Sequence, residues 1–127
     1  MEKREGERGQ SLVELVLCLP LLILIFMGVF DLGRVFNAYI VISNAAREGA
    51  NYGSLHPLDS SGIIQRVVNE AWNSGITLTT GDVQILSSGT SGTPIRVTVS
   101  HNFQLLWSSL VSGRVIYLRS YAEMVIF

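Results

Sequence analysis

A long apolar run near the amino terminus constrains this chain more than any other feature. The nineteen residues from Leu12 to Phe30 contain one charged side chain, Glu14. An α-helix needs about twenty mainly apolar residues to cross the hydrocarbon core of a bilayer. The run therefore predicts a membrane-spanning helix. An ordinary secretory signal peptide has a shorter apolar region, of about seven to fifteen residues, and a small-residue cleavage site, and no Ala-x-Ala-like site follows Phe30 directly.

Charged residues in and around the run predict its orientation. A charge inside a membrane helix costs roughly 2.5 to 3.5 kcal/mol on insertion scales. Glu14 is therefore either a functional residue or a residue at the headgroup boundary that marks the helix end. Lys3, Arg4 and Arg8 precede the run, and the first positive residue after it is Arg34. Because positive residues favour the cytoplasmic side, we expect the amino terminus to be cytoplasmic and the rest of the chain to be exported.

The helical pattern continues beyond the run. Asp31 and Arg34 are three residues apart and lie on one helix face. They form either an ion pair at the membrane surface or contacts with a neighbouring subunit. Pro20 lies in the middle of the run and removes one backbone hydrogen bond, which predicts a kink or a locally unwound turn.

A stripe of small residues follows on the same predicted helix. Ala45, Gly49 and Gly53 recur every four residues, and such spacing lets another element approach the helix backbone closely. That element is either this chain's own sheet or the helix of a second subunit. Gly53, followed by Pro57, is a usual signal for a helix end. The pattern predicts one helix over residues 11–52.

The remaining residues, 54–127, predict a small α+β head. Asp59, Ser60 and Ser61 are possible caps of a second helix. Apolar residues at helical spacing follow them, and Gly75 is the signal for the end of this helix. Alternating apolar and polar residues then predict three or four antiparallel strands, in the ranges 76–79, 83–85, 95–100 and 115–127. The apolar segment from Phe103 to Leu110 either packs on the sheet or lies at the membrane surface.

Composition excludes several classes of function. The net charge of −1 is too small to predict a nucleic-acid partner. The single cysteine, Cys18, allows neither an intramolecular disulfide nor a cysteine metal site. His56 and His101 stand alone, and no nucleophile or phosphate-binding motif is present. We therefore expect neither an enzyme nor a bound cofactor or metal.

The amino-terminal pattern resembles the processing site of type IV prepilins. A short basic leader is followed by Gly9, and Glu14 is the fifth residue after that glycine. The resemblance implies cleavage by a prepilin peptidase after Gly9, which leaves Gln10 as the new terminus. It also implies that Glu14 of one subunit meets the freed amino terminus of its neighbour. A carboxylate in an apolar helix bundle is tolerable only when it is paired.

A longer segment, Gly9 to Gly53, resembles the TadE-like family, the pseudopilins of the tight adherence (Tad, Flp pilus) system. The resemblance rests on a GQ-x-x-VE opening, an LPLL centre, a D-x-GR continuation and an AAREGA close. It implies a leader at residues 1–9, a transmembrane helix and its extension at 10–53, and an exported head at 54–127. The candidates for contacts between subunits are Glu14, Asp31, Arg34, Gly49 and Gly53.

The resemblance also implies a role and partners. The role is that of a minor pilin-like subunit in the bacterial cytoplasmic membrane or in a surface pilus used for adhesion. The partners are the prepilin peptidase, the major pilin and other pseudopilins, and the inner-membrane assembly platform with its cytoplasmic ATPase. Two alternatives remain. One is an uncleaved single-pass adaptor whose exported head binds another envelope protein, and the other is a substrate-binding or enzymatic head on a tether.

Overall fold

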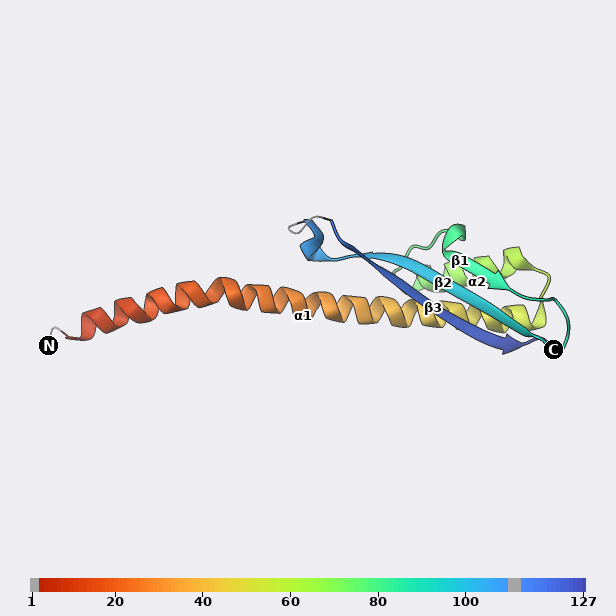
Figure 1. The fold of residues 1–127 in the computed structure, drawn as a ribbon, viewed down its shortest axis with the longest axis horizontal. Helices are drawn as coiled ribbons and strands as arrows, with labels where there is room; N and C mark the ends of the chain where they lie inside the picture. Colours follow the sequence, from red (N-terminus) through yellow and green to blue (C-terminus); the bar gives the residue numbers. More distant parts are fainter. Residues whose placement is uncertain (1–2, 110–112) are drawn as a thin grey trace. The chain divides into compact units, whose positions relative to one another are not determined.

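The structure, a computed structural model, describes residues 3–109 and 113–127. The chain divides into two compact units, residues 1–33 and 34–127, which are described separately. Two helices and three strands follow one another along the chain (Figure 1), with bounds α1 Lys3–Leu55, α2 Ser60–Asn73, β1 Val83–Leu86, β2 Pro94–Gln104 and β3 Val115–Val125. Two short 3-10 helices, η1 Thr80–Asp82 and η2 Leu106–Ser109, precede β1 and follow β2. The prediction of an α+β chain with a long first helix and a three-stranded antiparallel sheet is confirmed.

Helix α1 is longer at both ends than the sequence predicted. It begins at Lys3 rather than near residue 11, and it ends at Leu55 rather than at Tyr52. Starting a helix is the costly step, and each residue added to an existing helix contributes one hydrogen bond. The apolar run therefore supplies a nucleus from which the charged leader extends. Pro20 lies inside α1, so the helix continues past it and the predicted unwound turn is wrong.

Helix α2 begins where its caps were predicted. Asp59 is the N-cap, and its Oδ1 atom accepts hydrogen bonds from the Gly62 backbone N–H at 3.0 Å and from the Ser61 hydroxyl at 2.9 Å. Its Oδ2 atom accepts a bond of 2.9 Å from the Tyr52 hydroxyl of α1. One carboxylate therefore caps α2 and ties it to α1.

These hydrogen bonds change the pKa of both partners. The Gly62 N–H, followed by the Tyr52 and Ser61 hydroxyls, lowers the pKa of Asp59, because all three bonds favour the carboxylate. The same contact raises the pKa of Tyr52, since the neutral phenol donates to Asp59. A depressed carboxyl pKa stabilises the fold above the unfolded-state value near 3.9, and this contribution is lost as the pH falls through the folded-state pKa.

We expect Asp59→Ala to lower the melting temperature of the head at pH 7 and Asp59→Asn to lower it less. Asparagine caps helices about as well as aspartate, whereas alanine leaves the first N–H groups of α2 without a cap. Thermal unfolding followed by circular dichroism measures the difference. The gap between wild type and Asp59→Ala should narrow as the pH falls below about 4. Equal melting temperatures for wild type and Asp59→Ala at pH 7 would contradict this account.

The three strands form an antiparallel sheet in the order β1-β2-β3. Val83 of β1 faces Val99 of β2, and Val97 of β2 faces Ala122 of β3. The strand predicted over 76–79 is wrong, because this segment has no strand assignment. Its alternation comes from two side chains that face the core as the chain passes from α2 to η1, Ile76, which is half-buried, and Leu78, which is buried.

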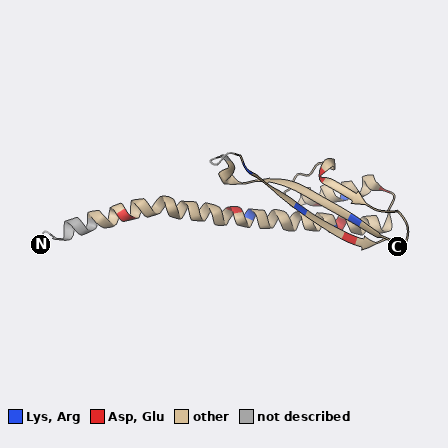
Figure 2. Cartoon of the chain, in the orientation of Figure 1, with Lys and Arg blue, Asp and Glu red and all other residues tan. Residues whose placement is uncertain are grey.

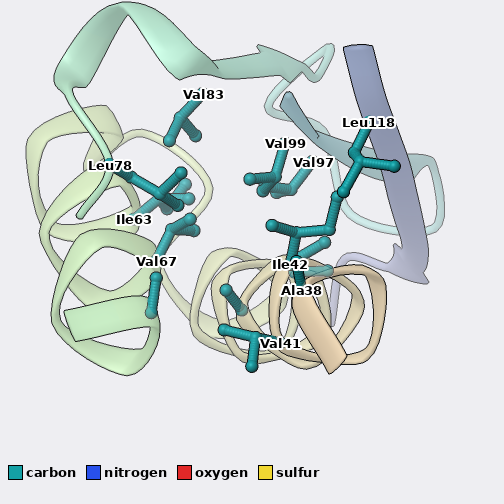
Figure 3. Close-up of a cluster of buried hydrophobic side chains, with 14 of the residues drawn as sticks. Ala38, Val41, Ile42, Ile63, Val67, Leu78, Val83, Val97, Val99 and Leu118 are labelled. Atoms are coloured by element: carbon teal, nitrogen blue, oxygen red, sulfur yellow. The ribbon is translucent and has the colours of Figure 1, made fainter. Parts of the chain in front are cut away.

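The core of the head lies between the sheet and the two helices, and Figure 3 draws fourteen of its residues and labels ten of them. It is built from one face of α1, one face of α2 and the inner face of the sheet. Its fully buried members are Ile42, Ala45, Ala46, Ala50, Ile63, Val67, Ala71, Ile95, Val97 and Val99. A hydrogen bond of 2.8 Å between the Ser43 and Ser120 hydroxyls joins α1 to β3 beside this core.

The small-residue stripe of α1 faces this chain's own core. A Cβ atom at Gly53 would lie 2.6 Å from Cδ1 of Ile95 in β2 and 3.0 Å from Cδ1 of Ile63 in α2. A Cβ atom at Gly49 would overlap Val67 of α2. Of the two alternatives for the stripe, the structure therefore shows the intramolecular one. Packing within the head accounts for both glycines without a second subunit.

Candidate functional site

The first half of α1 carries an exposed apolar surface. From Gly9 to Phe30 every side chain is exposed except for Met27 and Gly28, which are half-buried. Leu17 and Phe26 are 71% and 73% exposed. Contiguous apolar surfaces of this kind on a protein mark sites of interaction with a membrane or a partner. This surface is the main candidate for the functional site.

The same segment has the length and composition of a membrane span. In the part of the chain that the structure describes, one helix, within Gly9–Leu55, is long and apolar enough to cross a bilayer. From Gly9 to Phe30 the sequence contains one acidic residue, Glu14, and this part of α1 is mostly tan in Figure 2. The observation is consistent with a single-pass membrane protein.

The predicted processing residues lie close together on α1. Gly9 and Gln10 are both helical and exposed, and no atom lies within 4 Å of the place where a Gly9 Cβ would be. Glu14 is exposed one turn further along, between the exposed side chains of Val13 and Leu15. All three residues are exposed on α1, so a peptidase or another subunit could reach them.

Asp31 and Arg34 mark the end of the apolar run. Asp31 is 3% exposed, which is unusual for a carboxylate. The Arg34 guanidinium lies over the Phe103 ring, with Cζ 4.9 Å from the ring centroid. A cation over an aromatic face is attracted by the ring quadrupole. Arg34 therefore fixes the end of β2 against α1, a structural role that its spacing from Asp31 did not predict.

A polar groove of about 470 Å³ lies beside this contact. Its lining includes Arg34 and Asn37 of α1, the turn after α2 from Ser74 to Thr77, and the end of β2 from His101 to Gln104. Among these residues His101 is the one titratable base, and none is a carboxylate. Within the described residues, no group of three or more His, Cys, Asp or Glu side chains comes together. The groove thus offers hydrogen-bonding groups and one cation, without a paired acid and base.

The other isolated residues have structural surroundings. His56 stacks on Tyr52, with ring centroids 4.6 Å apart, at the end of α1. Cys18 is exposed on the apolar run as a free thiol. Sequence reasoning did not find the contact of Tyr52 with Asp59 or that of Arg34 with Phe103. The first had a partial signal in the predicted Asp59 cap, whereas the second joins residues that are far apart in the sequence.

These features define a class: a chain with one candidate membrane helix that continues into a small α+β head, which is the architecture of pilins. The model of a family described as TadE-like protein matches residues 9–51, about a third of the chain. The matched segment holds Gly9, Glu14, the apolar run and the start of the head's core. The predicted resemblance is therefore confirmed over this range. Comparisons with curated proteins and with solved structures gave no match. The family match and the candidate span together indicate a membrane protein related to the Tad pilus.

Proposed function

We propose that this protein is a membrane-anchored pseudopilin, a minor pilin-like subunit for biogenesis of a tight adherence pilus. The chain is inserted with its amino terminus in the cytoplasm and its head outside, and a prepilin peptidase cuts it after Gly9. The mature subunit then joins other pilin-like chains through the apolar half of α1. The head has no catalytic role, and neither a cofactor nor a metal takes part.

One observation carries this proposal. The apolar half of α1 lies within the segment that matches the family model, and its apolar side chains are exposed. A helix that served only the fold of the head would bury its apolar side chains there. The second half of α1 does so, since Ile42, Ala45, Ala46 and Ala50 are fully buried. The first half therefore has another partner, which we infer to be the bilayer before assembly and neighbouring helices after it.

The proposed partners differ between the membrane, where the subunit is processed, and the pilus, where it is assembled. In the membrane these are the prepilin peptidase, the inner-membrane assembly platform with its cytoplasmic ATPase, and lipid. In the pilus they are the major pilin and other pseudopilins. The residues that line the groove beside Arg34 include His101 and no carboxylate, which favours an assembly role over an enzymatic head.

We expect Gly9→Val to block processing. The mature protein from cells with the prepilin peptidase should begin at Gln10, whereas Gly9→Val should retain residues 1–9, as should wild type from cells without the peptidase. A β-branched side chain at the cut position fills the space that a glycine leaves for the peptidase. Intact mass of protein recovered from membranes measures the result.

Gly28→Val is the matched control. Both glycines lie in α1, and no atom lies within 4 Å of an added Cβ at either position. The same substitution therefore leaves the fold of the head unchanged in both variants, and Gly28→Val should still be cut. Retention of Met1 in wild type, with or without the peptidase, would overturn the proposal in favour of an uncleaved adaptor whose head binds another envelope protein.

A further inference from the structure

The hairpin formed by β2 and β3 ends in an exposed apolar surface. Two 11-residue strands pair along their whole length, and near the end where the chain connects them Phe103 faces Ile116 and Asn102 faces Tyr117. We use "hairpin tip" for the exposed residues Leu106, Arg114, Val115, Ile116 and Tyr117. Its apolar members are between 37% and 63% exposed. The core of the head leaves these side chains uncovered.

A short stretch of chain and two contacts connect the hairpin tip to the end of the apolar run. Arg34 is four residues beyond Phe30, and four residues span at most about 14 Å in any conformation. The Phe103 ring centroid is 4.9 Å from Cζ of Arg34, and Ile116 pairs directly with Phe103. The headgroup layer is about 5 to 8 Å thick on each side of the hydrocarbon core. If the run spans the membrane, the hairpin tip is therefore within reach of this layer.

The charge and chemistry of the hairpin tip suit a lipid surface. From Ser100 to Ala122 the sequence contains two arginines, Arg114 and Arg119, and no acidic residue. Basic residues near a membrane are attracted to anionic headgroups. Aliphatic side chains together with an aromatic residue that carries a polar tip are typical of protein surfaces at the membrane interface. A protein partner would need no such proximity to the end of the apolar run.

The opposite end of the head is a natural comparison. Leu58 and Phe127 are exposed there, at 86% and 87%. The Phe127 backbone N–H donates to the Ser54 carbonyl at 3.1 Å, which fixes Phe127 near the end of α1. Ser54 is twenty residues from Arg34 on the same helix, a separation of about 30 Å. Apolar exposure at this end is therefore about 30 Å further along α1 than Arg34.

We propose that the hairpin tip contacts the headgroup layer of the membrane and so provides a second attachment of the head, in addition to α1. The contact holds the head against the bilayer before assembly. It has to be released when the subunit leaves the membrane. The inference rests on membrane insertion of the apolar run, which is part of the proposed function, but not on cleavage or on entry into a pilus.

Three full-length variants with a single tryptophan test the contact. The chain has two tryptophans, Trp72 and Trp107, and both are replaced by phenylalanine. One new tryptophan is then placed in the hairpin tip (Tyr117→Trp), at the far end (Phe127→Trp) or in the apolar run (Phe30→Trp). Each protein is reconstituted into vesicles of phosphatidylglycerol and phosphatidylcholine with or without bromine on the acyl chains near the headgroups.

We expect brominated lipid to quench most of the emission at positions 117 and 30 and little of it at position 127. Replacing phosphatidylglycerol with phosphatidylcholine should weaken quenching at 117 and leave it unchanged at 30. Trp72→Phe, which keeps the native Trp107 next to the hairpin tip, is a second reporter with a single mild substitution. It should be quenched like position 117.

Each of the other outcomes overturns the inference, and the pattern of quenching shows whether the hairpin-tip contact alone or the membrane span as well is absent. Quenching at 30 without quenching at 117 and Trp107 means that the helix is inserted but the hairpin tip is not at the membrane, and the proposed function survives. Absence of quenching at 30 removes the membrane span and with it both proposals. Shielding of 117 that grows with protein density, without quenching by lipid, assigns the hairpin tip to a second copy of the chain.

Discussion

Replacing Gly49 by leucine should destabilise the head by about 3 kcal/mol and lower its melting temperature by about 12 to 24 °C. An added Cβ would overlap Val67 of α2 and would lie 3.2 Å from Cγ1 of Val97 and 3.6 Å from Cγ2 of Ile63. Val67 cannot turn away, because β-branched residues in helices are nearly fixed in one χ1 rotamer. Both helices and β2 would have to move apart. Thermal unfolding of the full chain in detergent, followed by near-ultraviolet circular dichroism, measures the loss.

Two further variants separate overpacking from other effects. Gly33→Leu places the same side chain on α1 where no atom lies within 4 Å of the new Cβ, so the melting temperature should stay near that of wild type. Gly49→Ala should fall between the two, because the gain in helix propensity of about 1 kcal/mol partly offsets the overlap. A stable Gly49→Leu head would show that α1 does not pack on α2 and β2 as described.

Glu14→Gln should prevent the protein from joining the pilus while leaving its insertion and cleavage intact. If Glu14 pairs with the amino terminus of a neighbouring subunit in an apolar bundle, its loss leaves a buried charge without a partner. Breaking such a pair costs about 3 to 5 kcal/mol, which lowers the assembly equilibrium constant by about two to three and a half orders of magnitude. Co-purification with sheared pili, compared with the amount in membranes, measures this effect.

Glu7→Gln is the matched control for Glu14→Gln. The chemical change is the same, but residue 7 belongs to the leader, which the proposed cut removes. It should therefore assemble like wild type. Glu14→Asp keeps the charge on a shorter side chain and should assemble partially. Wild-type incorporation of Glu14→Gln would rule out the paired carboxylate and favour a headgroup-boundary role for this residue.

The elements that could be predicted from the sequence are those with local sequence signals. The apolar run predicted α1, and the Asp59 cap followed by an apolar face predicted α2. Alternation gave β1, β2 and β3, but it also produced the strand at 76–79 that the structure lacks. Burial of Leu78 creates the same local pattern as a strand, and whether a partner strand is present depends on residues far away in the sequence.

Predictions about the site divide in the same way. Gly9, Gln10 and Glu14 were identified from local spacing, and the family match over residues 9–51 covers all three. For Gly49 and Gly53 the sequence left two alternatives, this chain's own sheet or the helix of a second subunit. A small residue allows another element to approach closely, but it does not determine which element this is. The placement of Arg34 on Phe103 joins residues 69 positions apart, and the sequence carries no signal for this contact.

Contacts between distant segments of the head also determine the order in which the parts of its core can form. Residues 42–50 of α1 are among the first made, yet Val97, Leu118 and Ile126, which complete the same core, come from β2, from β3 and from the residue just after β3. Contacts between segments so far apart form late in folding. During synthesis the alanine-rich face of α1 must therefore wait uncovered until β3 has emerged. A chain that stalls before β3 would carry a membrane helix with an open core, which makes it a target for quality-control proteases.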